Sequence, residues 1–141
     1  MLLPKGQASP EFSVVLGFVA LVFLIMMIII FQKQSESFEF QVYLDAKKVA
    51  STIADNVNMI SQNGHGYYRY FSVPSTLHGN TDYDVSFDRN FLWINYTDVT
   101  YSVRLVTNDV EVDNLTKGDN ETNCVTNVEG RITIGTPCYL G

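Results

Sequence analysis

Acidic residues supply the side chains of this sequence that are best spaced for metal chemistry. Asp109, Glu111 and Asp113 alternate along a segment whose pattern predicts a strand. A second acidic group consists of Asp82, Asp84 and Asp88. Carboxylate oxygens are good ligands for calcium, but neither group has the spacing of a calcium-binding loop. We therefore interpret both groups as solvated acidic segments, and expect neither a metal ion nor a cofactor.

Other reactive side chains are few and widely separated. His65 and His78 are isolated, the two cysteines lack metal-ligand spacing, and the sequence has neither a glycine-rich phosphate loop nor a nucleophile motif. The net charge is −6 and no cluster of lysine and arginine is present, which argues against the phosphate neutralisation that nucleic-acid binding requires. The sequence thus predicts a protein that is not an enzyme and does not bind nucleic acid.

An apolar segment near the N-terminus dominates the first part of the chain. Residues 12–31 carry no charge and nothing more polar than Ser13. A helix of this length spans roughly 30 Å, the thickness of a bilayer core. Because Lys5 precedes the segment, we expect the N-terminus to stay in the cytoplasm and the C-terminal part to cross the membrane. The alternative, a secretory signal peptide cut near residues 35–37, conflicts with the length of the apolar run.

The residues just before this segment have the order of a helix start. Ser9 suits the N-cap, Pro10 the first helical position, and Glu11 the positive end of the helix dipole. Gly6 and Gln7 would then stay extended at the cytoplasmic face, where a membrane peptidase needs an extended substrate. The sequence therefore predicts a processing site beside a helix N-terminus.

Gly6 followed by Gln7-x-Ser9-x-Glu11-Phe12 and an apolar helix resembles the class III signal peptide of archaeal type IV pilins. The resemblance implies cleavage between Gly6 and Gln7 by a prepilin-peptidase-like aspartic protease. It also implies that Glu11 meets the amino terminus of a neighbouring subunit and so sets the register of a filament. An unpaired carboxylate among apolar helices costs several kcal/mol, whereas a partner charge at about 4 Å returns about 4 kcal/mol at an effective dielectric of about 20.

Two alternatives for these residues stay open. Glu11 can instead cap its own helix in the headgroup region. Gln7, once it is N-terminal, can cyclise to pyroglutamate, which would remove the positive charge that Glu11 is expected to meet. A mature N-terminus whose mass shows a free amine would exclude cyclisation.

Beyond the apolar segment the helical pattern continues on a polar background. Apolar residues recur at intervals of three and four at Phe38, Val42, Ala46, Val49, Ile53, Val57 and Ile60. The first strong stop signal is Asn63-Gly64, so one continuous helix of roughly fifty residues, about 80 Å long, is predicted to end there. The stripe would pack on a head domain or adjacent helices, and the alternative is a coiled-coil dimer.

From Tyr67 the apolar period changes to two, which predicts strands. The expected strand segments are 68–73, 83–87, 91–96, 101–106, 110–112 and 131–134. Turns at 88–90 and 96–98 predict that the central strands form an antiparallel meander with one face on the helix. The fold class is therefore α+β, with a cleaved leader (1–6), a long N-terminal helix (7–63) and a small antiparallel β-sheet head (64–141). The pilin resemblance implies the same architecture.

Modification and cross-linking sites fall in the part expected outside the membrane. N-glycosylation sequons begin at Asn95, Asn114 and Asn120. A disulfide between Cys124 and Cys138 is plausible in an exported segment, and the alternative is two buried free thiols. Closing a loop of about fifteen residues would stabilise the fold by roughly 3 kcal/mol.

The aromatic residues of the predicted strands allow two interpretations. Trp93 and its neighbours could form a carbohydrate-binding face, or they could fill the core of the sheet. We favour the core, because a small sheet needs large side chains for packing.

Together these features predict a structural subunit of an archaeal type IV-like pilus used in surface attachment. Its partners would be copies of itself, the prepilin-peptidase-like protease, the assembly machinery, N-linked glycans and, before assembly, the cytoplasmic membrane. The mature form would be an extracellular, cell-surface filament. The alternatives are a membrane-anchored extracellular binding module, a minor pilin, or an archaellum-type subunit.

Overall fold

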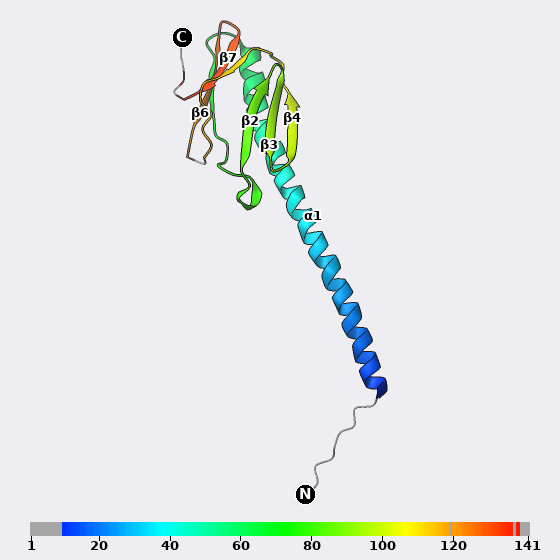
Figure 1. The fold of residues 1–141 in the computed structure, drawn as a ribbon. Coiled ribbons are helices and arrows are strands. Elements are labelled where there is room, and N and C mark those ends of the chain that lie inside the picture. The colour runs from blue at the N-terminus through cyan, green and yellow to red at the C-terminus, as the bar shows by residue number, and fades with distance from the viewer. Residues whose placement is uncertain (1–9, 119, 137, 139–141) are drawn as a thin grey trace. The chain divides into compact units, whose positions relative to one another are not determined.

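The computed structural model describes residues 10–118, 120–136 and 138 of the chain (Figure 1). Its elements in chain order are α1 (Pro10–Asn63), β1 (Tyr68–Phe71), the short 3-10 helix η1 (His78–Asn80), β2 (Tyr83–Asp88), β3 (Phe91–Tyr96), β4 (Val99–Arg104), β5 (Val110–Val112), β6 (Asn123–Val128) and β7 (Arg131–Gly135). The chain divides into two compact units, residues 1–39 and 40–141. The unit that contains the strands therefore also contains the second half of α1.

Helix α1 is continuous over 54 residues, as the sequence predicts. It begins at Pro10, whose fixed φ suits a first helical position, and Glu11 lies in its first turn. It ends at Asn63, and Gly64 follows with a φ of 87°, a left-handed conformation that glycine adopts at low cost after a helix. The predicted end of the helix is confirmed, whereas the predicted N-cap at Ser9 lies outside the described residues.

The second half of α1 buries the predicted apolar stripe. Its buried residues are Val42, Ala46, Val49, Ala50, Ile53, Ala54, Asn56, Val57 and Ile60. Phe38 also belongs to the predicted stripe, but its side chain is exposed. It lies in the unit of residues 1–39 and not in the unit that contains the strands. Ala46, Ala50 and Ala54 are the small residues of this buried face.

Strands β2, β3 and β4 form a three-stranded antiparallel meander, as predicted. The two-residue turns that join them fall at Arg89-Asn90 and Thr97-Asp98. Arg89 and Thr97 both have positive φ, which tight hairpin turns require at their first central position. The inward face of this sheet carries apolar side chains, including the buried Leu92 and Ile94.

The other four strands form a second sheet in the order β1-β6-β7-β5. The expectation of a wholly antiparallel head is wrong at one edge, where β5 pairs with β7 in parallel. Strand β6 was also not predicted, because its residues are buried on both faces and lack the alternation that marks a half-exposed strand. Glu129 and Gly130, both with positive φ, form the tight turn from β6 to β7.

Residues of α1 and of both sheets contribute to one hydrophobic core. Helix residues Ile53 and Val57 are fully buried in it together with Ile94 of β3 and Ile132 of β7. Two polar contacts fix the end of the helix against the strands. The Asn127 side chain donates to the Ile60 carbonyl at 3.3 Å, and the Val106 amide donates to Asn58 Oδ1 at 2.8 Å. The predicted packing of the meander on the helix is confirmed.

The two cysteines lie at disulfide distance, with Cα atoms 5.3 Å apart. Cys124 is buried in β6, and Cys138 follows the last strand. A bridge here closes a loop between residues 14 apart in sequence, which restricts the unfolded chain.

Replacing Cys138 with serine tests this cross-link without placing a hydroxyl in the core. We expect the free energy of unfolding to fall by about 3 kcal/mol, measured by guanidinium denaturation of the non-reduced protein. The same loss should follow when a reductant is added to the unmodified chain, and Cys138→Ser should then show no further loss. Equal stability of the reduced and non-reduced chains would contradict the structural role of the bridge.

Candidate functional site

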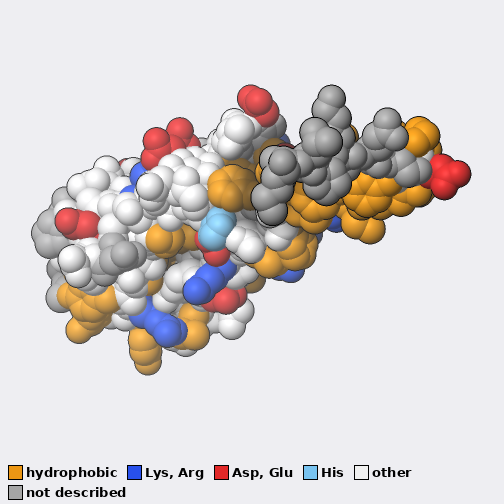
Figure 2. All heavy atoms as spheres, turned by 90° about the horizontal axis from the view of Figure 1, so that it is seen from below, with side chains coloured by type: hydrophobic (Ala, Val, Ile, Leu, Met, Phe, Trp, Pro, Cys, Tyr) orange, Lys and Arg blue, Asp and Glu red, His pale blue; other side chains and the backbone are white. Residues whose placement is uncertain are grey.

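The first half of α1 presents a continuous apolar surface. Its large hydrophobic residues are exposed from Phe12 (63% exposed) to Phe31 (65% exposed). The helix is long and apolar enough, by length and composition, to cross a membrane. Figure 2 shows hydrophobic side chains gathered along this part of the chain.

This surface is apolar around the whole helix and not along one stripe. The exposed residues include neighbours such as Ile28, Ile29 and Ile30, which point in different directions around a helix with 3.6 residues per turn. A helix that is hydrophobic on all sides is stable only when lipid or other protein surrounds it. Exposed apolar area of this size marks a membrane or protein interaction site. By length and composition this segment could be a membrane anchor or a signal sequence.

Glu11 lies at the N-terminal edge of this surface. It occupies the first turn of α1, and its side chain is exposed. A carboxylate in this position faces the positive end of the helix dipole. The predicted cleavage site at Gly6 and Gln7, and the predicted N-cap at Ser9, lie outside the described residues.

The apolar surface ends at Phe31, and the first charged residue after it is Lys33. Lys33 and Glu36 form an ion pair at 2.8 Å, three residues apart on the helix. Both side chains are largely exposed, so the pair contributes little to stability. It lies where the composition of the helix changes from apolar to polar and charged.

The sequon asparagines are all exposed, which is the accessibility that modification requires. Asn95 lies in β3, while Asn114 and Asn120 lie between β5 and β6. The sequon threonine Thr116 makes contacts with a buried residue. Thr116 donates from its hydroxyl to the Asn123 side-chain oxygen at 3.2 Å, and its backbone amide donates to the same oxygen at 2.8 Å. Asn123 is fully buried and anchors that loop, a role the sequence did not reveal.

The acidic residues Asp109, Glu111 and Asp113 line one pocket together with Arg131. Arg131 lies between Asp109 at 3.6 Å and Glu111 at 3.4 Å, which offsets the negative charge near the parallel strand pair. Asp84 faces Lys117 at 3.8 Å. Among the described residues, no group of three or more histidine, cysteine or carboxylate side chains is positioned to hold a metal ion.

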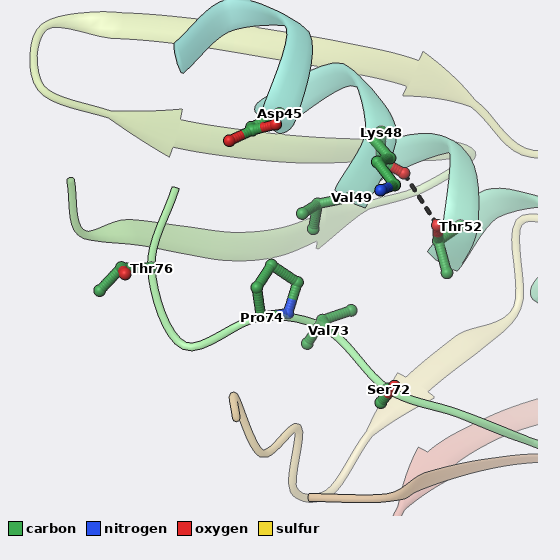
Figure 3. A pocket seen from close by; sticks show the side chains of 8 residues that line it. All are labelled: Asp45, Lys48, Val49, Thr52, Ser72, Val73, Pro74 and Thr76. Carbon is green, nitrogen blue, oxygen red and sulfur yellow. Dashed lines mark hydrogen bonds between the residues drawn. The ribbon is translucent and has the colours of Figure 1, made fainter. Parts of the chain in front are cut away.

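A groove of about 400 Å³ lies between α1 and the loop that follows β1 (Figure 3). Val49 of α1 and Val73 of the loop line it, and both are buried. Lys48 and Thr52 also line it, and the Thr52 hydroxyl donates to the Lys48 carbonyl at 2.9 Å. The further lining residues are Asp45, Ser72 and Thr76. The groove has one carboxylate, from Asp45, one ammonium group, from Lys48, and several hydroxyl groups. Within the described part of the chain, none of these hydroxyls is hydrogen-bonded to a side-chain base, so the lining does not form a recognisable catalytic arrangement.

Tyr83 connects three segments of the strand-containing unit. Its hydroxyl donates to the Pro74 carbonyl at 2.5 Å, and Lys117 lies 4.8 Å from the centre of its ring. Lys117 also donates to the Tyr83 carbonyl at 2.5 Å. Burial raises the pKa of Tyr83 to about 12, because the phenolate would lose its hydration. Burial, and then the neighbouring Tyr43, also raise the pKa of Tyr96.

The raised pKa of Tyr83 predicts that the fold weakens in alkali. Between pH 10 and about 12 the unfolded chain loses the phenolic proton first, so stability falls as the pH rises through this window. We expect a loss of about 2 kcal/mol by pH 12 from this residue. Unfolding curves at pH 8, 10 and 11.5 measure it, with Tyr83→Phe as the matched control. An equally steep alkaline loss in Tyr83→Phe would contradict the assignment.

Comparisons of the chain with protein-family models, with curated proteins and with solved structures found no match. The functional conclusion therefore rests on the residues and their arrangement.

Proposed function

We propose that this protein is the structural subunit of a type IV-like pilus that serves surface attachment. The observation that carries the proposal is the apolar surface of residues 12–31, which surrounds a helix that continues into the core of a folded β unit. Such a helix can be held by lipid before assembly and by the same helices of other subunits afterwards. The resemblance of residues 6–12 to the class III signal peptide of archaeal type IV pilins supports the same function.

The first proposed step is processing. A prepilin-peptidase-like aspartic protease cuts between Gly6 and Gln7 while residues 12–31 remain in the cytoplasmic membrane. The cut leaves Gln7 as the new amino terminus, four residues before Glu11. The strand-containing unit is outside the membrane at this stage, where the Cys124–Cys138 bridge can form.

The second proposed step is transfer of the helix from lipid to a bundle of helices. Lipid tails are as apolar as the helix, so transfer gains little from the hydrophobic effect and depends on close packing and polar contacts. Glu11 supplies such a contact. In an apolar surrounding its carboxylate is costly unless a positive group meets it, and the amino terminus of Gln7 in the next subunit is that group. Subunits in another axial register would leave both charges unpaired.

Fractionation of cells that produce the chain tests this proposal. Filaments sheared from the surface should contain the processed form beginning at Gln7, while the membrane fraction holds a pool of precursor. Mass spectrometry of the filament N-terminus also shows whether Gln7 carries a free amine or has cyclised. Retention of the whole population in membranes at full precursor length would refute the proposal and favour a membrane-anchored extracellular binding module. Trace amounts in filaments made of another chain would identify a minor pilin.

A further inference from the structure

The three-stranded sheet β2–β3–β4 separates its side chains cleanly between two faces. The inward positions are Tyr83, Val85, Phe87, Leu92, Ile94, Tyr96, Val99, Tyr101 and Val103. The outward positions are Asp84, Ser86, Asp88, Phe91, Trp93, Asn95, Thr100, Ser102 and Arg104. Except for Phe91 and Trp93, the outward residues are polar. The sequence-based assignment of Trp93 to the core is wrong, because Trp93 lies on the outward face and is partly exposed.

Phe91 and Trp93 form an aromatic pair on this polar face. Their ring centres are 5.9 Å apart, and Phe91 is 37% exposed. Trp93 is flanked in register by Ser86 and Ser102, which have short side chains, and it is partly exposed. The two rings are tilted by 41° to each other. Together they provide an apolar platform on the outward strand face, with the serine residues beside it.

The next outward residue on the same strand is the sequon asparagine Asn95. Residues two apart on a strand lie on one face, about 7 Å from each other. The Thr100 hydroxyl on β4 donates to Asn95 Oδ1 at 2.8 Å, which orients the side-chain amide on the sheet surface. Asn95 is exposed and its sequon ends at Thr97 in the following turn. The side chain that would carry a glycan therefore lies on the same strand face as the aromatic platform, two residues from Trp93.

We propose that Asn95 carries an N-linked glycan whose first sugar ring packs on Trp93. Attachment forms a bond between Asn95 Nδ2 and the anomeric carbon of the sugar, and breaks the bond from that carbon to the phosphate of a lipid-linked glycosyl donor. The amide nitrogen loses one proton and the lipid phosphate leaves with the bonding electrons. The C–H face of the sugar then covers the indole ring, removing apolar area from water on both partners.

The other two sequons lack this arrangement. Asn114 and Asn120 lie in the connection between β5 and β6 and not on a strand face with an aromatic partner two residues away. The inference thus applies to Asn95 specifically. It rests on the proposed export of the strand-containing unit, but not on filament assembly.

The single tryptophan of the chain makes the proposal directly measurable, since all tryptophan fluorescence comes from Trp93. The full chain is purified in detergent from cells that produce it, as the Thr97→Ala variant, which removes the sequon, and as the Thr97→Ser variant, which keeps it. Glycopeptide mass spectrometry determines the occupancy of Asn95. Quenching of the fluorescence by acrylamide reports how well Trp93 is covered, and a thermal scan gives Tm.

We expect Asn95 to be occupied in the unmodified chain and in Thr97→Ser but not in Thr97→Ala. Quenching of Trp93 should be stronger in Thr97→Ala than in Thr97→Ser, and Tm should be lower by roughly 3–8 °C. Trp93→Leu, combined with each Thr97 variant, completes a double-mutant cycle. If the sugar packs on the indole ring, Thr97→Ala should lower Tm much less in the Trp93→Leu background.

Three results would overturn the proposal. The first is an unoccupied Asn95 in the unmodified chain. The second is an occupied Asn95 with equal quenching in both Thr97 variants and additive Tm changes in the cycle. The third is equal quenching of Trp93 in Thr97→Ala and Thr97→Ser, together with weaker quenching of Thr97→Ala when a free glycan is added. This result would make the platform a site for a separate ligand. Filaments are counted on the same cells, so occupied Asn95 without filaments would refute the proposed function alone.

Discussion

Glu11→Ala is expected to reduce surface filaments to less than about a tenth of their normal number. The proposed register contact pairs the Glu11 carboxylate with the amino terminus of Gln7 in a neighbouring subunit. Removing one partner of a buried ion pair costs about 3–5 kcal/mol, because the remaining charge stays buried without compensation. Each 1.4 kcal/mol corresponds to about a tenfold change in an association constant, so every subunit addition is weakened by about a hundredfold or more.

Electron microscopy of sheared filaments measures this effect, with the amount of chain in the membrane determined in parallel. The matched control is Glu36→Ala, the same substitution on the charged part of α1, where the side chain is 66% exposed. This variant should assemble normally, since loss of an exposed ion pair costs little. Normal filament numbers in Glu11→Ala at equal membrane levels would refute the register role and leave Glu11 as a cap of its own helix.

Ile53→Ala is expected to destabilise the strand-containing unit by about 2–5 kcal/mol, while Ile25→Ala is expected to leave its stability nearly unchanged. The two isoleucines lie on the same helix, but Ile53 is fully buried among strand residues and Ile25 is 50% exposed. Removing buried methyl groups loses their transfer free energy and leaves a cavity. Removing the same groups from the exposed apolar surface leaves the core of the other unit intact.

Guanidinium denaturation of both variants in detergent, followed by the fluorescence of Trp93 in β3, measures the unfolding of the strand-containing unit. Ile25→Ala should instead weaken the packing between helices of neighbouring subunits, and so reduce the number of filaments. Equal losses of stability in the two variants would contradict the division of α1 into an exposed apolar half and a half that belongs to the core.

The helix is the element that the sequence predicts best, because several independent signals agree on it. Pro10 and Glu11 indicate its start, the three-and-four spacing from Val42 to Ile60 indicates its buried face, and Gly64 indicates its end. In the second half of the helix, the apolar spacing and the packing on the strands favour the same conformation. Burial in the structure follows the predicted stripe from Val42 onward.

The strands are predicted less completely, because pairing depends on contacts far apart in sequence. The meander β2–β3–β4 has alternating faces and short turns, so the sequence reveals it. Strand β6 is buried on both faces, and its partner β1 lies more than fifty residues earlier, which leaves no local period to detect. The Glu129-Gly130 turn was the available signal, since a glycine there permits a two-residue hairpin.

In the candidate site, too, some features can be predicted from the sequence and others depend on strand pairing. The exposure of residues 12–31 follows from their composition, whereas the outward position of Trp93 depends on the register of β3 against its neighbours. A tryptophan in a small sheet is expected in the core on grounds of size alone. Here the inward face is filled by Leu92 and Ile94, and alternation then places Trp93 on the side of Asn95.

A cryo-microscopy map of filaments sheared from the cell surface tests the central proposal most directly. We predict a helical polymer whose side-chain density fits this chain, with residues 12–31 bundled along the axis and Glu11 beside the amino terminus of Gln7 in a neighbouring subunit. The strand-containing unit would face outward, with extra density on Asn95 over Trp93. A filament core formed by a different chain, with this one left in the membrane, would contradict the proposed function.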